Sequence, residues 1–123
     1  MREMLVAAEH LTRRFESAGL FRRGRAVQAV TDVSLGVARG EAVGLVGESG
    51  SGKSTVGRLL LGLLPPSAGR VSFGGADLAA ANPAALRQLR RRMQLVFQDP
   101  DDSHDPRRKI GAQIADALEI HDI

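Results

Sequence analysis

The residues best suited to chemistry form one short run from Gly47 to Thr55, which reads Gly-Glu-Ser-Gly-Ser-Gly-Lys-Ser-Thr. This run matches the pattern G-x-x-x-x-G-K-[ST], whose glycines let backbone N–H groups turn inward around a polyphosphate. In that arrangement Lys53 can reach the outer phosphates, and the Ser54 hydroxyl can ligate Mg²⁺. The run therefore predicts a binding site for a nucleoside polyphosphate with magnesium.

A loop of this kind needs a strand before it and a helix after it, and the sequence predicts both. Ala42–Val46 is short and apolar, as expected of a buried parallel strand. Residues 56–64 have the length of a helix and stop before a Pro-Pro pair. The N-terminus of that helix would add free N–H donors and the positive end of the helix dipole. A chance glycine-rich turn is the alternative, and the agreement between motif and flanks disfavours it.

Length and composition limit the number of domains, the cysteine chemistry and the membrane topology that the chain can have. The 123 residues suggest one domain, with 43% apolar and 25% charged residues, as in ordinary globular proteins. Cysteine is absent, which excludes a disulfide framework and thiolate chemistry. No apolar run approaches the ~18 residues of a membrane span, and the apolar start of the chain is too short for a signal peptide. We therefore expect a cytoplasmic chain without direct membrane insertion.

The net charge of +3 raises the question of nucleic acid binding. The chain has four Phe and neither Tyr nor Trp, which argues against a surface for stacking bases. The run Arg90-Arg91-Arg92 is explained most simply as the exposed face and last turn of a helix, where cations suit the dipole. No nucleic acid partner is expected.

The rest of the chain alternates between strand and helix patterns. Asn82 and Pro83 are typical of a helix start, and Leu86, Leu89 and Met93 follow on one face. The pattern further predicts strands at 5–8, 27–37, 71–73 and 94–98, loops at 16–25, 65–69 and 101–105, and a final amphipathic helix through Ile110, Ile114, Ala117 and Leu118.

A second motif narrows the class of phosphate-binding protein. Gln98 lies 45 residues after Lys53, within Met93-Gln94-Leu95-Val96-Phe97-Gln98-Asp99-Pro100, and this resembles the glutamine loop of ATP-binding-cassette (ABC) ATPases. Other segments of the sequence resemble the same family: Val33-Ser34-Leu35, Arg39-Gly40-Glu41 and residues 61–69. The amino-acid sequences of residues 19–23, 47–55 and 89–94 resemble the branch of the family that powers prokaryotic importers of oligopeptides, dipeptides and nickel.

The resemblance implies an α/β fold with a P-loop NTPase core, a partial ABC ATPase domain carrying an N-terminal antiparallel β-subdomain. Residues 1–98 would form the β-subdomain and P-loop core, and 99–123 the exit of the glutamine loop and the start of the helical subdomain. A complete ABC ATPase also carries a Leu-Ser-Gly-Gly-Gln signature, an Asp-Glu pair and a switch histidine, none of which occurs in these 123 residues. Phe73-Gly74-Gly75-Ala76 echoes the signature, but its position predicts a turn. We therefore expect the N-terminal portion of such a domain.

The resemblance also implies roles for individual residues. Gln98 would ligate Mg²⁺ and sense the γ-phosphate, or else simply bond to backbone at a strand end. Phe15 would stack on adenine, with Phe21 as a minor rival for that role and core packing as the alternative. His10, His104 and His121 lack metal-ligand spacing and are expected on the surface. The nucleotide would be held by Gly47, Ser49, Gly50, Ser51, Gly52, Lys53, Ser54 and Thr55.

The function implied is ATP binding, with Mg²⁺, in the energy-coupling subunit of an importer, for peptides by the branch resemblance. Its partners would be membrane-spanning permease subunits and a second ABC ATPase subunit, which would hold it peripherally at the inner membrane. An ABC ATPase without a membrane partner and a non-hydrolysing nucleotide-binding fragment are the alternatives. The acidic stretch 101–105 departs from the branch pattern. The 123 residues alone are expected neither to turn over ATP nor to be very stable.

Overall fold

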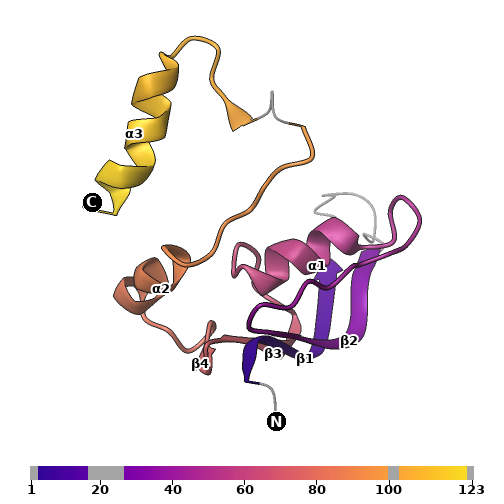
Figure 1. The fold of residues 1–123 in the computed structure, drawn as a ribbon. Coiled ribbons are helices and arrows are strands. Elements are labelled where there is room, and N and C mark those ends of the chain that lie inside the picture. The colour runs from indigo at the N-terminus through magenta and orange to yellow at the C-terminus, as the bar shows by residue number, and fades with distance from the viewer. Residues whose placement is uncertain (1–2, 17–26, 100–102, 122–123) are drawn as a thin grey trace.

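A computed structural model describes residues 3–16, 27–99 and 103–121. Along the chain, two strands are followed by a helix, two further strands and two further helices (Figure 1). They are β1 (Met4–Phe15), β2 (Val27–Ala38), α1 (Lys53–Leu60), β3 (Ala68–Phe73), β4 (Ala76–Asp77), α2 (Pro83–Arg90) and α3 (Ile110–Ile120).

The strands form one antiparallel sheet in the order β2-β1-β3-β4. The antiparallel N-terminal subdomain is thus confirmed, and its strands are longer than the predicted 5–8, 27–37 and 71–73. The turn predicted at Gly74-Gly75 joins β3 to β4. The predicted loop 16–25, with Phe21, lies almost wholly outside the described residues.

A double irregularity interrupts β1 and β2 at the same level. His10 (φ 51°) and Asp32 (φ 48°) are the non-glycine residues with positive φ in the described part of the chain. Their side chains meet, with His10 Nδ1 2.7 Å from Asp32 Oδ1. Each backbone N–H donates to a hydroxyl of the other strand, His10 to Ser34 Oγ and Asp32 to Thr12 Oγ1. The shift in register lets Leu11 enter the core, where it is fully buried.

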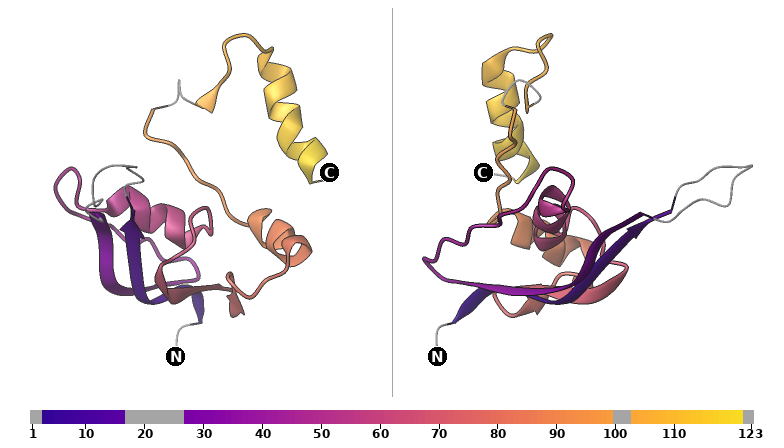
Figure 2. Two further views of the ribbon diagram at one scale, coloured as in Figure 1. Left: turned by 180° about the vertical axis from the view of Figure 1, so that it is seen from behind. Right: turned by 90° about the vertical axis from the view of Figure 1, so that its right-hand side faces the viewer.

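Helix α1 covers one face of the sheet (Figure 2). Val56 and Leu59 share one buried cluster with residues of all three long strands, among them Leu11, Val30 and Val71. The helix begins earlier than predicted and ends at Leu60, because Gly62 adopts φ 62° and Leu63 N–H donates back to Arg58 O at 2.9 Å. This reversed bonding around a left-handed glycine is a common helix stop.

Helix α2 begins where the sequence predicts. Asn82 is its N-cap, with Oδ1 accepting from Ala85 N–H at 2.8 Å, and Pro83 is its first residue. The arginine run is more than a solvated face: Arg90 donates to Gly62 O at 3.1 Å, and the Arg92 guanidinium lies 5.2 Å from the Phe73 ring centroid. These contacts hold α2 to the end of α1 and to β3.

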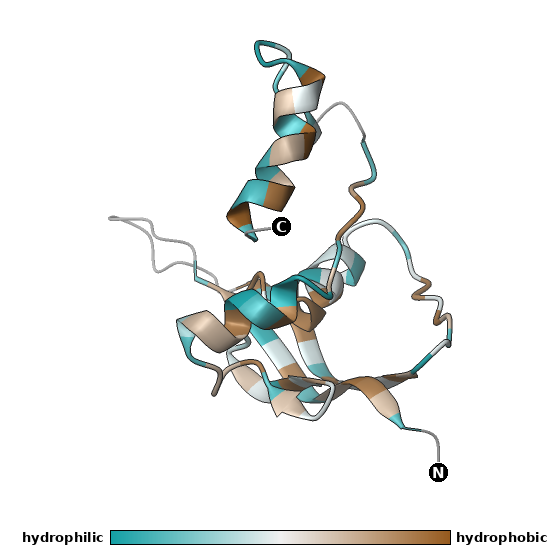
Figure 3. Cartoon of the chain, turned by 60° about the vertical axis from the view of Figure 1, so that its left-hand side comes forward, coloured by the Kyte–Doolittle hydropathy of each residue, from teal (hydrophilic) through white to brown (hydrophobic). Residues whose placement is uncertain are grey.

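Two predicted strands do not form, and both predictions are wrong for this structure. Residues 42–46 and 94–98 form no strand ladder, and Val46 and Val96 are 97% and 86% exposed. Both segments carry hydrophobic residues outside the sheet (Figure 3). A strand needs a neighbour to satisfy its backbone, and among the described residues neither segment has one. The parallel part of the predicted α/β core is therefore absent from the described part of the chain.

Helix α3 stands apart from the sheet in Figure 1 and meets α2 through Arg87, which donates to Ile120 O. Gln113 exchanges two hydrogen bonds with the Asp105 backbone, and Arg108 makes a bidentate pair with Asp116 at 2.6 and 3.0 Å. The hydrogen bonds of this pair are the main reason that the pKa of Asp116 is lowered and the pKa of Arg108 is raised. Among the helices that the structure describes, none is long and apolar enough to cross a membrane.

Candidate functional site

The predicted phosphate-binding run lies between β2 and α1 and ends as the first turn of that helix. Gly52 is the N-cap of α1, in the left-handed region at φ 95°, and no side chain caps the helix. No acidic residue lies in the first turn either. The first N–H groups of α1 therefore face outward without an internal partner, at the positive end of the helix dipole. That arrangement suits an anion.

Lys53 folds back over the loop. Its Nζ donates to Gly47 O at 2.6 Å, to Glu48 O at 2.5 Å and to Ser51 Oγ at 3.2 Å. These contacts curl residues 47–53 around the ammonium group, and all the acceptors are neutral. An anionic phosphate oxygen makes a stronger, charge-assisted bond with an ammonium, so a polyphosphate can compete for the same donor.

The loop is fixed to the sheet through close backbone contact with β2. A Cβ placed on Gly52 would lie 2.3 Å from Ala29 O and 3.6 Å from Val30 Cγ2. Only a residue without a side chain fits such an approach. Ala29 was not singled out from the sequence, because its role is carried by its carbonyl and not by its residue type.

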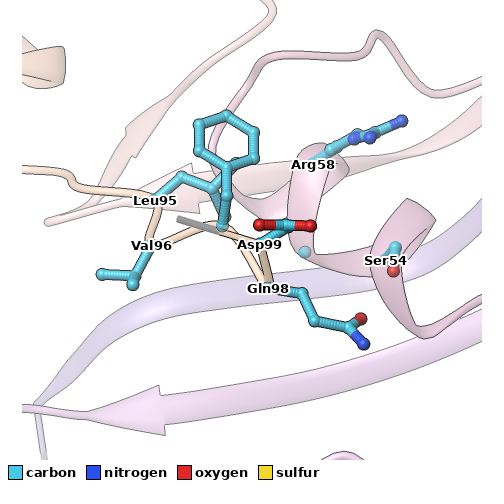
Figure 4. A pocket seen from close by; sticks show the side chains of 8 residues that line it. Ser54, Arg58, Leu95, Val96, Gln98 and Asp99 are labelled. Carbon is cyan, nitrogen blue, oxygen red and sulfur yellow. The ribbon is translucent and has the colours of Figure 1, made fainter. Parts of the chain in front are cut away.

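The structure brings Gln98 to the phosphate-binding loop. An open cavity of about 440 Å³ is lined by Ala29, Ser49, Gly50, Gly52, Lys53, Ser54, Thr55 and Gln98. Gln98 and Ser54 also share a neighbouring cavity of about 580 Å³ with Arg58 and Asp99 (Figure 4). In Figure 4 the Gln98 amide extends toward the Ser54 side of α1. Gln98 thus reaches the loop although the predicted strand at 94–98 is missing.

The donors at this point suit magnesium. Ser54 is exposed, and its hydroxyl and the Gln98 amide are neutral oxygen donors on two sides of one cavity. Mg²⁺ prefers oxygen ligands, keeps several waters, and is commonly held by one or two protein groups together with substrate phosphates. Groups of three or more His, Cys, Asp or Glu that could hold a metal do not occur among the described residues. Of the histidines expected on the surface, His10 and His104 are exposed and His121 is half-buried, and His10 is paired with Asp32.

Phe15 is not among the residues that line the cavity. It ends β1, pairs with Val27 in the ladder, and is 39% exposed. Core packing does not explain it, because the buried cluster of the described residues does not include it. The Arg13 guanidinium, which sequence reasoning did not single out, lies 4.8 Å from its ring centroid.

A family profile and several curated proteins match this chain over most of its length. The profile of the family described as ABC transporter matches residues 30–122, which is most of the chain. Two curated relatives from Brucella carry the name "Putative peptide import ATP-binding protein". One, from Brucella abortus (strain 2308), is 46% identical over 97% of this chain and 36% of its own length. Another, from Brucella ovis, is 48% identical over 82% of this chain and 32% of its own length. The chain spans about a third of the length of these relatives.

Solved structures with the same fold belong to ABC proteins. cbiO1 from Clostridium perfringens, part of the ABC transporter complex cbiONQ, superposes with a TM-score of 0.64 at 28% identity, over 81% of this chain and 36% of that one. The ATP-binding cassette MJ0796, in a dimeric post-hydrolysis state bound to ADP and Pi, gives a TM-score of 0.60 at 28% identity, over 70% and 35% of the two chains. Because the family profile matches residues 30–122 and curated relatives are 46–48% identical over most of its length, this chain belongs to the ABC transporter family.

Proposed function

We propose that the chain binds Mg-ATP through residues 47–55 and is the N-terminal, P-loop part of the ATP-binding subunit of an importer for peptides. One observation carries the ATP-binding proposal: the loop wraps the Lys53 ammonium, at the free N-terminus of α1, in the cavity that Gln98 also lines. Four kinds of phosphate ligand converge there, namely an ammonium, backbone N–H groups, a hydroxyl and an amide.

Each residue has a distinct task in this proposal. The backbone N–H groups of 50–55 bind the phosphate chain, and Lys53 turns from its carbonyl acceptors toward the outer phosphate oxygens. Magnesium, when bound, neutralises part of the phosphate charge and would be held by Ser54 and Gln98. Gln98 ends the apolar segment 94–98 and would carry the presence of the γ-phosphate into residues 99–123. Positioning and charge stabilisation supply most of the rate in phosphoryl transfer, so these residues would be catalytic by placement.

The wider assignment rests on the relatives. The names of the Brucella proteins support peptide import, and family membership supports a permease in the membrane and a second ATP-binding subunit as partners. The chain would lie at the cytoplasmic face of the inner membrane through these partners. Residues 1–98 would be the β-subdomain and P-loop core, and 99–123 the exit of the glutamine loop and the start of the helical subdomain. Arg58 and Asp99, which line the cavity next to Ser54, have no assigned task.

The chain offers a matched test of ATP binding, because Lys53 and Lys109 are its two lysines. Lys53→Met removes a charge-assisted hydrogen bond worth about 1.5–3 kcal/mol, so the dissociation constant of Mg-ATP should rise at least about tenfold. Lys109→Met removes the same charge at the start of α3 and should leave the dissociation constant unchanged. Calorimetry on the three purified chains makes the comparison. Equal affinity in the parent chain and the Lys53 variant would refute the proposed site.

Gln98 is tested against Gln94, whose amide donates to Leu95 O and which lines neither cavity. Gln98→Ala should weaken ATP binding in the presence of Mg²⁺ more than in EDTA, and Gln94→Ala should change neither value. In the assembled transporter, Gln98→Ala should lower peptide-stimulated ATP turnover more than ATP binding. Parental turnover and uptake in that variant would exclude a coupling role for Gln98.

A further inference from the structure

Arg13 and Phe15 form a stacked pair at the end of β1. Residues two apart on a strand point to the same face of the sheet, and here the guanidinium carbon of Arg13 lies 4.8 Å from the Phe15 ring centroid. A cation at this distance is attracted by the negative face of the ring. The Phe15 ring therefore has one face covered by a guanidinium group, and 39% of the residue stays exposed.

The Arg13 side chain is held at its far end as well. Its Nη1 donates to Pro65 O at 2.8 Å, and its Nε is buried without a hydrogen-bond partner among the described residues. Pro65 belongs to the segment that follows α1, and Ser67 N–H in that segment donates to Thr12 O at 2.8 Å. The guanidinium is thus fixed between β1 and the chain that leaves the P-loop helix, so the ring stacked on it is fixed too.

Phe15 lies near Ala29 in the sheet. Phe15 pairs with Val27, two residues before Ala29, whose carbonyl receives the close approach of Gly52. Ala29 itself lines the cavity of about 440 Å³ that holds Lys53 and Ser54. Two residues of a strand span about 7 Å, so a nucleoside that extends from the cavity along β2 toward Val27 reaches the end of β1 that carries Phe15.

We propose that Arg13 is a positioning residue for the nucleotide base: it holds the Phe15 ring from one face and leaves the other face for adenine. This inference rests on the proposed function, since it concerns the same bound nucleotide. Stacking on an aromatic ring is tolerant of base identity, so the contribution is to affinity for the nucleoside and not to discrimination among bases. A ring already fixed in place loses less freedom on binding than a mobile one.

The test compares a nucleotide with a ligand that lacks the nucleoside. Arg13→Met keeps an unbranched side chain of similar length but removes the charge and the bond to Pro65. It should weaken Mg-ATP binding roughly two- to fivefold and leave binding of Mg-tripolyphosphate unchanged. Arg13→Lys should restore part of the loss, and Arg14→Met, its neighbour on the opposite face, should have no effect. Thermal unfolding midpoints of all variants separate binding effects from folding effects.

Two further readouts are not moved by a merely structural role. In a Phe15→Ala background, Arg13→Met should cause no additional loss of ATP affinity, and the Phe15 ring proton shifts should move on adding Mg-ATP but not Mg-tripolyphosphate. Equal losses for both ligands, or a gain in ATP affinity, would overturn the inference, the gain by showing that the guanidinium competes with the base. If ATP binding in the parent chain proves independent of Lys53, the proposed function fails and this inference falls with it. If binding depends on Lys53 and Arg13→Met is silent, only this inference fails.

Discussion

The close approach of Gly52 to β2 gives the sharpest test of how the phosphate-binding loop is built. Gly52→Ala introduces two separable penalties. The first is the left-handed backbone at φ 95°, which costs an L-residue about 1–2 kcal/mol. The second is the collision of the new Cβ with Ala29 O, at 2.3 Å before any adjustment. Because the obstacle is backbone, the loop or the strand must shift, at a cost of about 1–3 kcal/mol.

Gly50→Ala is the matched control. Gly50 has a comparable φ of 79°, but a Cβ placed there meets nothing within 4 Å. It carries the first penalty alone, so the expected loss of unfolding free energy is about 1–2 kcal/mol for Gly50→Ala and about 2–5 kcal/mol for Gly52→Ala. Urea unfolding followed by circular dichroism measures both against the parent chain, and equal slopes with urea confirm that the same transition is compared.

The two variants should also differ in ligand binding. A shift of the loop away from Ala29 moves the N–H groups of α1, so Gly52→Ala should weaken Mg-ATP binding more than Gly50→Ala does. If the two variants lose the same stability, the loop is not seated on β2 in the way described, and the reasoning from the Ala29 contact is refuted.

Other expectations follow from burial, capping and charge. Leu11→Ala removes a fully buried side chain and should lower the free energy of unfolding in urea by about 2–5 kcal/mol. Val46→Ala, at a 97% exposed position, should change it by less than about 0.5 kcal/mol. Similar values for the two variants would contradict the assigned core. Asn82→Ala should cost about 1 kcal/mol through loss of the α2 N-cap, and an unchanged urea midpoint would show that the cap contributes nothing. The Arg108 pair lowers the pKa of Asp116, so its stabilisation is complete above the ordinary aspartate pKa of about 3.9 and is lost as the pH falls through the lowered value. Carboxyl NMR titration should place Asp116 below that value and return it there in Arg108→Met; an ordinary midpoint in the parent would exclude the pair.

Local signals predicted much of the molecule correctly. The α2 start at Asn82 and Pro83 depends on one cap and one fixed φ, and both are local properties of the sequence. The phosphate-binding loop also depends on residues adjacent in sequence, so its position could be anticipated, whereas Gln98, which lines the same cavity, was expected only from the family resemblance. The end of β1 differs from the predicted end at residue 8, because the register of β1 is set by the His10–Asp32 irregularity, a contact across 22 residues.

The failed predictions share one physical cause. The apolar patterns of 42–46 and 94–98 indicate buried strands, but a strand forms only when neighbours satisfy its backbone and cover its faces. The described residues supply neither, so the same side chains are exposed. Ala29 was missed for a different reason: a backbone carbonyl in contact with a glycine leaves no trace in residue type.

Backbone amide NMR during titration with Mg-ATP tests the central claim most directly, because it locates the ligand residue by residue. We expect the largest shifts at the N–H groups of 50–55 and at the Gln98 side-chain amide, with the α3 amides unchanged. Lys53→Met should abolish these shifts at the same ATP concentration, and Lys109→Met should retain them. Shifts centred on the arginines of α2, or a response that survives in Lys53→Met, would contradict the assignment of residues 47–55 as the nucleotide site.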